Sequence, residues 1–148
     1  MSQEDPFRLY VSHLWAEDDD YLRLFEYIND VENFFYVNLS DPADQPRSME
    51  FELVVAQYRR QMEKAEVAIM LSTQYVTNAN MTQYQLNLAR ELSVPVVVIE
   101  PYGPDSVLKP VKDRAAEVVP WYNRSIVDAI RHHGRGDLTS RYEVIDFP

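Results

Sequence analysis

The fold is decided by residues 67–100, which run VAIMLST at 67–73, NANMTQYQLNLARELS at 78–93 and VPVVVIE at 94–100. The first and last runs are almost wholly apolar, as strands are when helices cover both faces of a sheet. We therefore expect two interior strands of a parallel sheet. Between them, apolar residues recur at helical spacing at Met81, Leu88 and Leu92 and predict one amphipathic helix. Gln85 lies in line with this stripe, so one amide interrupts an apolar helix face.

Further strands and helices are predicted on either side of this stretch. We expect strands at 7–12, 34–38 and 117–120, a first helix after the acidic cluster 17–20, and a second helix at 49–64. Pro120 suits a strand at the edge of the sheet. Ser125 is predicted to cap the last helix and Gly134 to stop it, because Ser favours helix starts and Gly favours helix ends. The polar loop 39–48 is long for a compact α/β domain, and such loops are often functional.

Strands that alternate with helices indicate a doubly wound α/β domain. We predict a flavodoxin-like parallel sheet of five strands in the order 2-1-3-4-5, within a single domain of residues 1–148 whose core spans about 7–131. The polar tail 135–148 contains one apolar patch, 142–145, that could add a strand or cover the sheet. The ligand crevice of this fold lies at the carboxyl ends of strands one and three, where the strand order reverses.

The composition excludes several classes of function. A formal charge of −10 opposes binding to nucleic-acid phosphates, which depends on Lys and Arg. With three glycines, all in the last third, neither a Gly-rich dinucleotide loop nor a Walker phosphate loop can form. The absence of Cys fits a reducing compartment and excludes thiol catalysis. No window resembles a membrane helix or a secretory signal, so we expect a cytoplasmic protein with neither nucleic acid nor membrane as a partner.

Three segments should meet at the predicted crevice, namely residues 12–15, residues 38–42 and the start of the helix that carries Gln85. The candidate site residues in the first two are Ser12, His13, Leu14, Trp15, Asn38 and Ser40. His13 is either a general acid or a loop residue, and Trp15 either stacks on a nucleotide ring or covers the first helix. Ser12 and Ser40 are either ligand contacts or ordinary turn residues.

Two well-known flavodoxin-like classes do not fit, and no metal site is predicted. A response-regulator receiver has an Asp after strand three and a Lys after strand five, where this chain has Leu71-Ser72-Thr73 and Pro120-Trp121. A flavodoxin has a hydroxyl- and Gly-rich phosphate loop after strand one, and SHLWAEDDD lacks it. The acids at 18–20 are interpreted as helix caps, and His132 and His133 as a pair at a helix end.

An ordered series of short motifs along residues 7–131 carries a family resemblance. The motifs are Tyr10-Val11-Ser12-His13-Leu14-Trp15, Asp20-Tyr21, Asn38-Leu39-Ser40, Ala65 to Leu71, Tyr75-Val76, Tyr84-Gln85-Leu86 with Ala89, Pro95 to Ile99 with Pro101-Tyr102-Gly103, and Trp121 to Val127. In this series the chain resembles the bacterial TIR-like family that includes the TIR protein of Thoeris antiphage defence.

The resemblance implies an enzyme that cleaves the nicotinamide–ribose bond of NAD. Its product would be a cyclic or conjugated ADP-ribose signal that activates a separate effector protein during phage infection. NAD is then a substrate, no prosthetic group is needed, and a homo-oligomer is compatible with the resemblance. The implied catalytic positions are Gln85 and His13. The implied substrate contacts are Ser12, Leu14, Trp15, Asn38, Ser40 and Tyr84.

The chain departs from this family at the catalytic position. The family has a Glu before the pattern Ile-x-x-Ala and a Trp four residues earlier, whereas this chain has Gln85 and Met81 there. An amide keeps the shape of the carboxylate but loses its charge. Gln85 is therefore a structural amide, a natural non-catalytic variant, or a Glu→Gln substitution that traps ligand. The rival functional hypothesis is a non-catalytic TIR-like module that binds nucleotides or other proteins.

Overall fold

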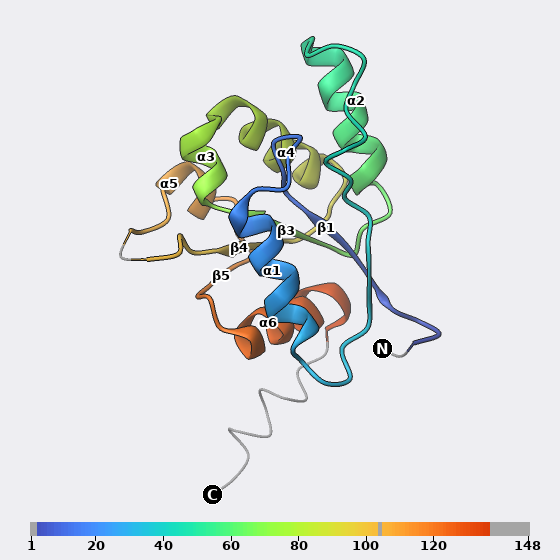
Figure 1. Ribbon diagram of the computed structural model, residues 1–148, viewed down its shortest axis with the longest axis vertical. Coiled ribbons are helices and arrows are strands. Elements are labelled where there is room, and N and C mark those ends of the chain that lie inside the picture. Colours follow the sequence, from blue (N-terminus) through green and yellow to red (C-terminus); the bar gives the residue numbers. More distant parts are fainter. Residues whose placement is uncertain (1–2, 104, 137–148) are drawn as a thin grey trace, which may run out of the picture.

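The computed structural model describes residues 3–103 and 105–136 and contains the predicted five-stranded sheet (Figure 1). Its strands are β1 (Phe7–Val11), β2 (Tyr36–Asn38), β3 (Val67–Leu71), β4 (Val96–Ile99) and β5 (Glu117–Val119). Its helices are α1 (Asp19–Asn29), α2 (Phe51–Met62), α3 (Thr73–Thr77), α4 (Ala79–Glu91), α5 (Lys109–Lys112) and α6 (Asn123–Arg135). All neighbouring strands are parallel and follow the order β2-β1-β3-β4-β5, which confirms the predicted fold class.

Helices cover both faces of the sheet, which explains why its central strands are apolar throughout. Every residue of β3 and β4 is buried. On one face Leu24 of α1 and Ile130 of α6 pack into a common apolar cluster with β1, β3 and β4. On the other face Val54 of α2 and Leu86 of α4 belong to a second cluster. Figure 1 shows the same division, with α1 and α6 together on one side and α2 and α4 on the other.

The helix predicted at 78–93 is preceded by a second, short helix that the sequence pattern did not predict. Asn78 ends α3 and caps α4, because its backbone is extended and its side chain accepts a hydrogen bond of 3.1 Å from the Met81 amide. Thr82 reinforces this corner by donating to the Asn78 carbonyl at 3.0 Å. The break aims α4 so that Gln85 faces the end of β1.

The predicted start of the last helix was wrong by nearly one turn, and its predicted end by about half a turn. α6 begins at Asn123, and Tyr122 precedes it without a side-chain cap, so Ser125 lies inside the helix. Gly134 also lies inside, and Gly136 in the left-handed region at φ 70° ends the helix. Gly134 instead permits close packing, since a Cβ there would lie 3.0 Å from side-chain carbons of both Phe7 and Val67, which would have to shift to make room for it.

The end of α6 is fixed to the start of β1 and β3 by charged groups. Arg135 donates to Glu66 at 2.9 Å and to Asp5 at 3.2 Å, and its guanidinium lies 4.1 Å from the ring centroid of Phe7. The patch at 142–145, for which we considered either an added strand or a cover over the sheet, lies outside the described residues. No helix among the described residues is both long enough and apolar enough to cross a membrane.

We predict that Gly134→Val lowers the free energy of unfolding by about 1–3 kcal/mol, because a branched side chain must displace the sheet residues that touch this turn of α6. Urea unfolding followed by circular dichroism measures the change. Arg124→Val places the same side chain at an exposed position of α6 and should change stability far less. Equal losses in the two variants would contradict the packing role of Gly134.

Candidate functional site

The candidate site is built around the β1–α1 loop, residues 12–18, at the carboxyl ends of β1 and β3. Ser12 continues the sheet beyond β1, since its amide donates to Ile69 at 2.8 Å and its hydroxyl accepts from the Leu71 amide at 2.9 Å. Gln74 of α3 donates to the Ser12 carbonyl at 3.0 Å. These hydrogen bonds fix the point at which the chain leaves the sheet. The Ser12 hydroxyl is bonded to the backbone of β3.

Gln85 lies directly beneath this loop and is fully buried. Its Oε1 accepts from the Tyr10 hydroxyl at 2.6 Å and from the His13 amide at 3.1 Å. Its Nε2 donates to the His13 carbonyl at 3.0 Å and to the Met81 carbonyl at 3.1 Å. The side-chain amide thus uses both of its donors and both of its acceptor lone pairs inside the protein.

This pattern fixes the orientation of the amide and distinguishes it from a carboxylate. The His13 amide can be satisfied only by an oxygen, and the two carbonyls only by an N–H group. A carboxylate at position 85 would keep the two donors at Oε1 but would place its second oxygen against the carbonyls of His13 and Met81. The surroundings of Oε1 therefore suit either an amide or a carboxylate, whereas the surroundings of Nε2 suit an amide alone.

His13 is fully buried and neutral, and its tautomer follows from its partners. Its Nε2 lies 2.8 Å from Gln61 Oε1, which can only accept, so Nε2 carries the proton. Its Nδ1 then accepts from the Trp15 amide at 3.2 Å. Burial lowers the pKa of the imidazole from 6.5 to about 4. At neutral pH His13 therefore connects the β1–α1 loop to α2 and carries no charge.

Trp15 covers His13 and Tyr58 with its indole ring. Its backbone is in a strained conformation. Its φ is 65°, a region that non-glycine residues rarely adopt, and its exposed fraction is only 6%. The indole stacks on Tyr58 with ring centroids 4.6 Å apart and meets the edge of His13 at 4.7 Å. Its Nε1 is buried and finds no hydrogen-bond partner among the described residues. One donor of the site is thus left unused.

Asn38 and Ser40 form an adjoining polar cluster around Tyr21 of α1. Asn38 donates to the Tyr21 hydroxyl at 3.1 Å, and the Ser40 hydroxyl lies 2.8 Å from the same oxygen. The Tyr21 ring in turn meets His13 edge-on at 6.4 Å. The structure therefore brings Asn38 and Ser40 next to the His13 and Gln85 cluster, as predicted for the crevice.

The other two candidates lie at the margin. Leu14 is half-buried within the β1–α1 loop. Tyr84 is also half-buried, and its ring packs edge-on against Phe51 of α2 at 5.0 Å. Phe51 itself is 59% exposed, so this pair belongs to the outer surface of α2 and α4.

Sequence reasoning missed several residues that hold the site together. Tyr58 donates to the His13 carbonyl at 2.7 Å, and Gln61 exchanges hydrogen bonds of 2.9 Å with the backbone of Asp41. Gln57 donates to the Asp44 carbonyl at 2.8 Å, so α2 holds the β2–α2 loop by amide side chains. The sequence contains a pattern that could have indicated Gln57 and Gln61, because both interrupt the apolar face of α2 at helical spacing, as Gln85 does on α4.

Of the acidic residues at the start of α1, Asp18 caps the helix and Asp20 bonds to neighbouring side chains. Asp18 accepts from the Tyr21 amide at 2.8 Å, which makes it the N-cap of α1. Asp20 pairs with Arg23 and accepts from the Thr73 hydroxyl at 2.7 Å. Within residues 3–103 and 105–136, no group of three or more His, Cys, Asp or Glu side chains is placed to hold a metal ion.

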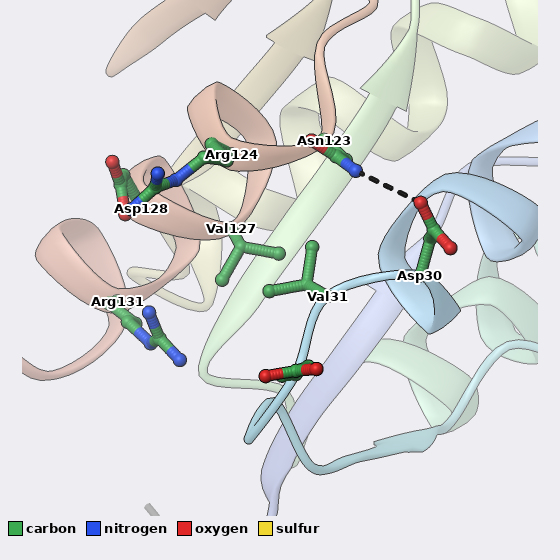
Figure 2. Close-up of a pocket in the computed structure, with 8 residues that line it drawn as sticks. Asp30, Val31, Asn123, Arg124, Val127, Asp128 and Arg131 are labelled. Atoms are coloured by element: carbon green, nitrogen blue, oxygen red, sulfur yellow. Dashed lines mark hydrogen bonds between the residues drawn. The ribbon is translucent and has the colours of Figure 1, made fainter.

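Two surface clefts lie away from Gln85. The one in Figure 2, of about 350 Å³, separates α6 from the segment after α1, and Val31 faces Val127 across it while Asn123 donates to Asp30 at 3.4 Å. Arginines and carboxylates both line it, so their charges largely offset one another. A second cleft of about 530 Å³ lies between α3 and the segment after β4, with Val76 on its wall. Neither cleft is lined by Gln85 or His13.

Comparison with known proteins gives no match, either to a protein-family model or to a curated protein sequence.

We predict that His13 makes the protein sensitive to mild acid. In the unfolded chain the imidazole takes up a proton below about pH 6.5, but in the folded protein only below about pH 4, so stability falls as the pH decreases through this window. The loss should reach about 2 kcal/mol at pH 5 and about 3 kcal/mol near pH 4. Urea titrations at several pH values measure it. Other titrating groups remain in His13→Gln, so the difference between the two proteins isolates the imidazole, and identical pH profiles would contradict this prediction.

We also predict that Gln85→Glu destabilises the fold by about 1–3 kcal/mol, because the new oxygen faces two carbonyls. Burial and these carbonyls should raise the pKa of the introduced carboxyl, so the loss should grow as the pH rises from about 4.3 through that raised pKa. Thermal and urea unfolding between pH 4.5 and 8 test both points. Gln83→Glu adds the same charge two residues away at a partly exposed position of α4 and serves as the matched control.

Proposed function

We propose that this chain is a TIR-like domain that binds NAD at the carboxyl ends of β1 and β3, and that residue 85 decides whether the dinucleotide is cleaved. The observation that carries the proposal is the position of Gln85. It lies at the point where the strand order reverses, held by Tyr10 and by both backbone groups of His13. This is the place at which flavodoxin-like folds bind their ligands.

The chemistry follows from the charge at this position. Cleavage of the nicotinamide–ribose bond develops positive charge on the ribose, and a nearby carboxylate stabilises that charge. The amide of Gln85 carries no charge, which would lower the rate by a factor on the order of 10² to 10³. The present sequence should therefore hold NAD and cleave it slowly or not at all.

The neighbouring residues supply binding and positioning. The unused Nε1 donor of Trp15 suits a phosphate or carbonyl oxygen, and its ring suits a stacked base. Asn38 and Ser40 suit ribose hydroxyls, with Leu14 and Tyr84 at the margin. His13 is neutral at physiological pH, so it positions the loop and does not protonate the leaving group. Because Gln85 and His13 are fully buried, a ligand reaches them only when the β1–α1 loop moves.

In this proposal the domain works in the cytoplasm as part of antiphage defence. A form with a carboxylate at position 85 would release nicotinamide and a cyclic or conjugated ADP-ribose product. That product would activate a separate effector protein. The resemblance of the motif series supports this setting, together with the fold and the polar cluster beneath the β1–α1 loop.

A second candidate is a TIR-like module without catalysis, which binds NAD or ADP-ribose, or associates with other proteins. The specific observation in its favour is that Gln85 satisfies all its hydrogen-bonding groups within the protein. A buried amide whose donors and acceptors are all bonded within the protein suits a structural role. This candidate predicts binding or self-association of the present chain with no consumption of NAD.

We expect Gln85→Glu to release nicotinamide from NAD at least about 100-fold faster than the unsubstituted chain, because the carboxylate supplies the missing charge. Chromatography of nicotinamide and of the ADP-ribose product measures the rate. Calorimetry with NAD and the unsubstituted chain should show binding without turnover.

The control is Gln83→Glu, which adds a carboxylate to α4 outside the cluster and should stay inactive. No turnover by Gln85→Glu, in purified form and in phage-infected cells, would exclude the catalytic hypothesis. Binding heat or self-association of the present chain would then favour the second candidate. Absence of ligand heat, of oligomers and of turnover would contradict both candidates.

A further inference from the structure

Tyr10 has a buried hydroxyl that is assigned neither as a catalytic position nor as a substrate contact in the proposed function. It lies in β1, an interior strand between β2 and β3, and is fully buried. Its hydroxyl donates to Gln85 Oε1 at 2.6 Å, across 75 positions of sequence. Burial raises the pKa of this hydroxyl well above its ordinary value, so it remains a donor throughout the physiological range.

A phenylalanine would fill the same space in the apolar cluster between the sheet, α2 and α4. A buried hydroxyl is costly unless it is paired, and here Gln85 is its acceptor. Among the described residues, the other donor to that oxygen is the His13 amide, which belongs to the β1–α1 loop. Tyr10 is therefore the donor that comes from the sheet itself.

We propose that Tyr10 is a positioning residue for the side chain at position 85, and that it keeps a carboxylate there ionised. The donor fixes one oxygen of the side chain, whether amide or carboxylate, against the end of β1. The consequence for catalysis depends on the proposed function, whereas the positioning itself does not.

Opposing effects set the charge of a carboxyl introduced at position 85. Burial and the carbonyls of His13 and Met81 favour the neutral form, while Tyr10 and the His13 amide favour the ionised form. Removing the Tyr10 hydroxyl deletes one of the two stabilising donors. The pKa of the carboxyl should then rise by about one to two units.

The test compares Gln85→Glu with the double variant Tyr10→Phe/Gln85→Glu, each with labelled Glu side chains, by carbon NMR titration without NAD. We expect the pKa of the position-85 carboxyl to be higher by about one to two units in the double variant. Tyr58→Phe/Gln85→Glu is the matched control, because Tyr58 is equally buried but donates to the His13 carbonyl. Its carboxyl pKa should shift much less. Equal pKa values in all three proteins would overturn the proposal.

A second measurement does not require the carboxyl variant to fold. In Tyr10→Phe with Gln85 retained, the side-chain amide protons of Gln85 should exchange with solvent about tenfold faster than in the unsubstituted chain, because the amide has lost its donor from the sheet. Unchanged exchange would also overturn the positioning role.

Activity separates this proposal from the proposed function. If Gln85→Glu cleaves NAD, the acidic limb of its pH–rate profile should move upward with the carboxyl pKa in the double variant. If the pKa shift is found but NAD is not cleaved, the positioning role of Tyr10 stands and the NAD-cleaving function fails. If NAD is cleaved with no pKa shift, the reverse holds.

Discussion

The structure depends most on the hydrogen bonds between Gln85 and the two backbone groups of His13. A loop that leaves the middle of a parallel sheet carries polar backbone into a region from which water is excluded, and that backbone needs partners. The amide of Gln85 supplies an acceptor and a donor to one residue of this loop at 3.1 and 3.0 Å. The turn at Trp15 and the single tautomer of His13 both rely on the loop being held in this place.

Neutral amides support the rest of this end of the sheet in the same way. Gln74 holds the Ser12 carbonyl, while Gln57 and Gln61 hold the backbone of the β2–α2 loop. An amide can satisfy an N–H and a C=O group together and carries no charge, so it costs little to bury when both are present. In a chain with a formal charge of −10, a cluster built this way avoids adding further buried carboxylates.

The sequence predicted the sheet order and placed Gln85 on the apolar face of its helix, because two nearly all-apolar runs flanking a helix leave few other arrangements. The sequence mispredicted the end of α6. Glycine is typical of the residue that stops a helix, but Gly134 lies inside α6 in close contact with Phe7 and Val67. The partners of Gln85 could not be predicted. In a sequence pattern Tyr10 cannot be distinguished from a buried Phe. Only the position of α4 against β1 in the structure shows that the Tyr10 hydroxyl donates to Gln85.

Trp15 gives the closed site an optical signature. The chain has two tryptophans, and Trp15 is enclosed between Tyr58 and His13, whereas Trp121 packs against Tyr27 near the start of α6. A movement of the β1–α1 loop away from Gln85 would transfer the Trp15 indole from its aromatic neighbours into water, which would shift its emission to longer wavelength. Replacing Trp121 by Phe would leave Trp15 as the single tryptophan, so the opening of the loop could be followed in real time by tryptophan emission without an added label.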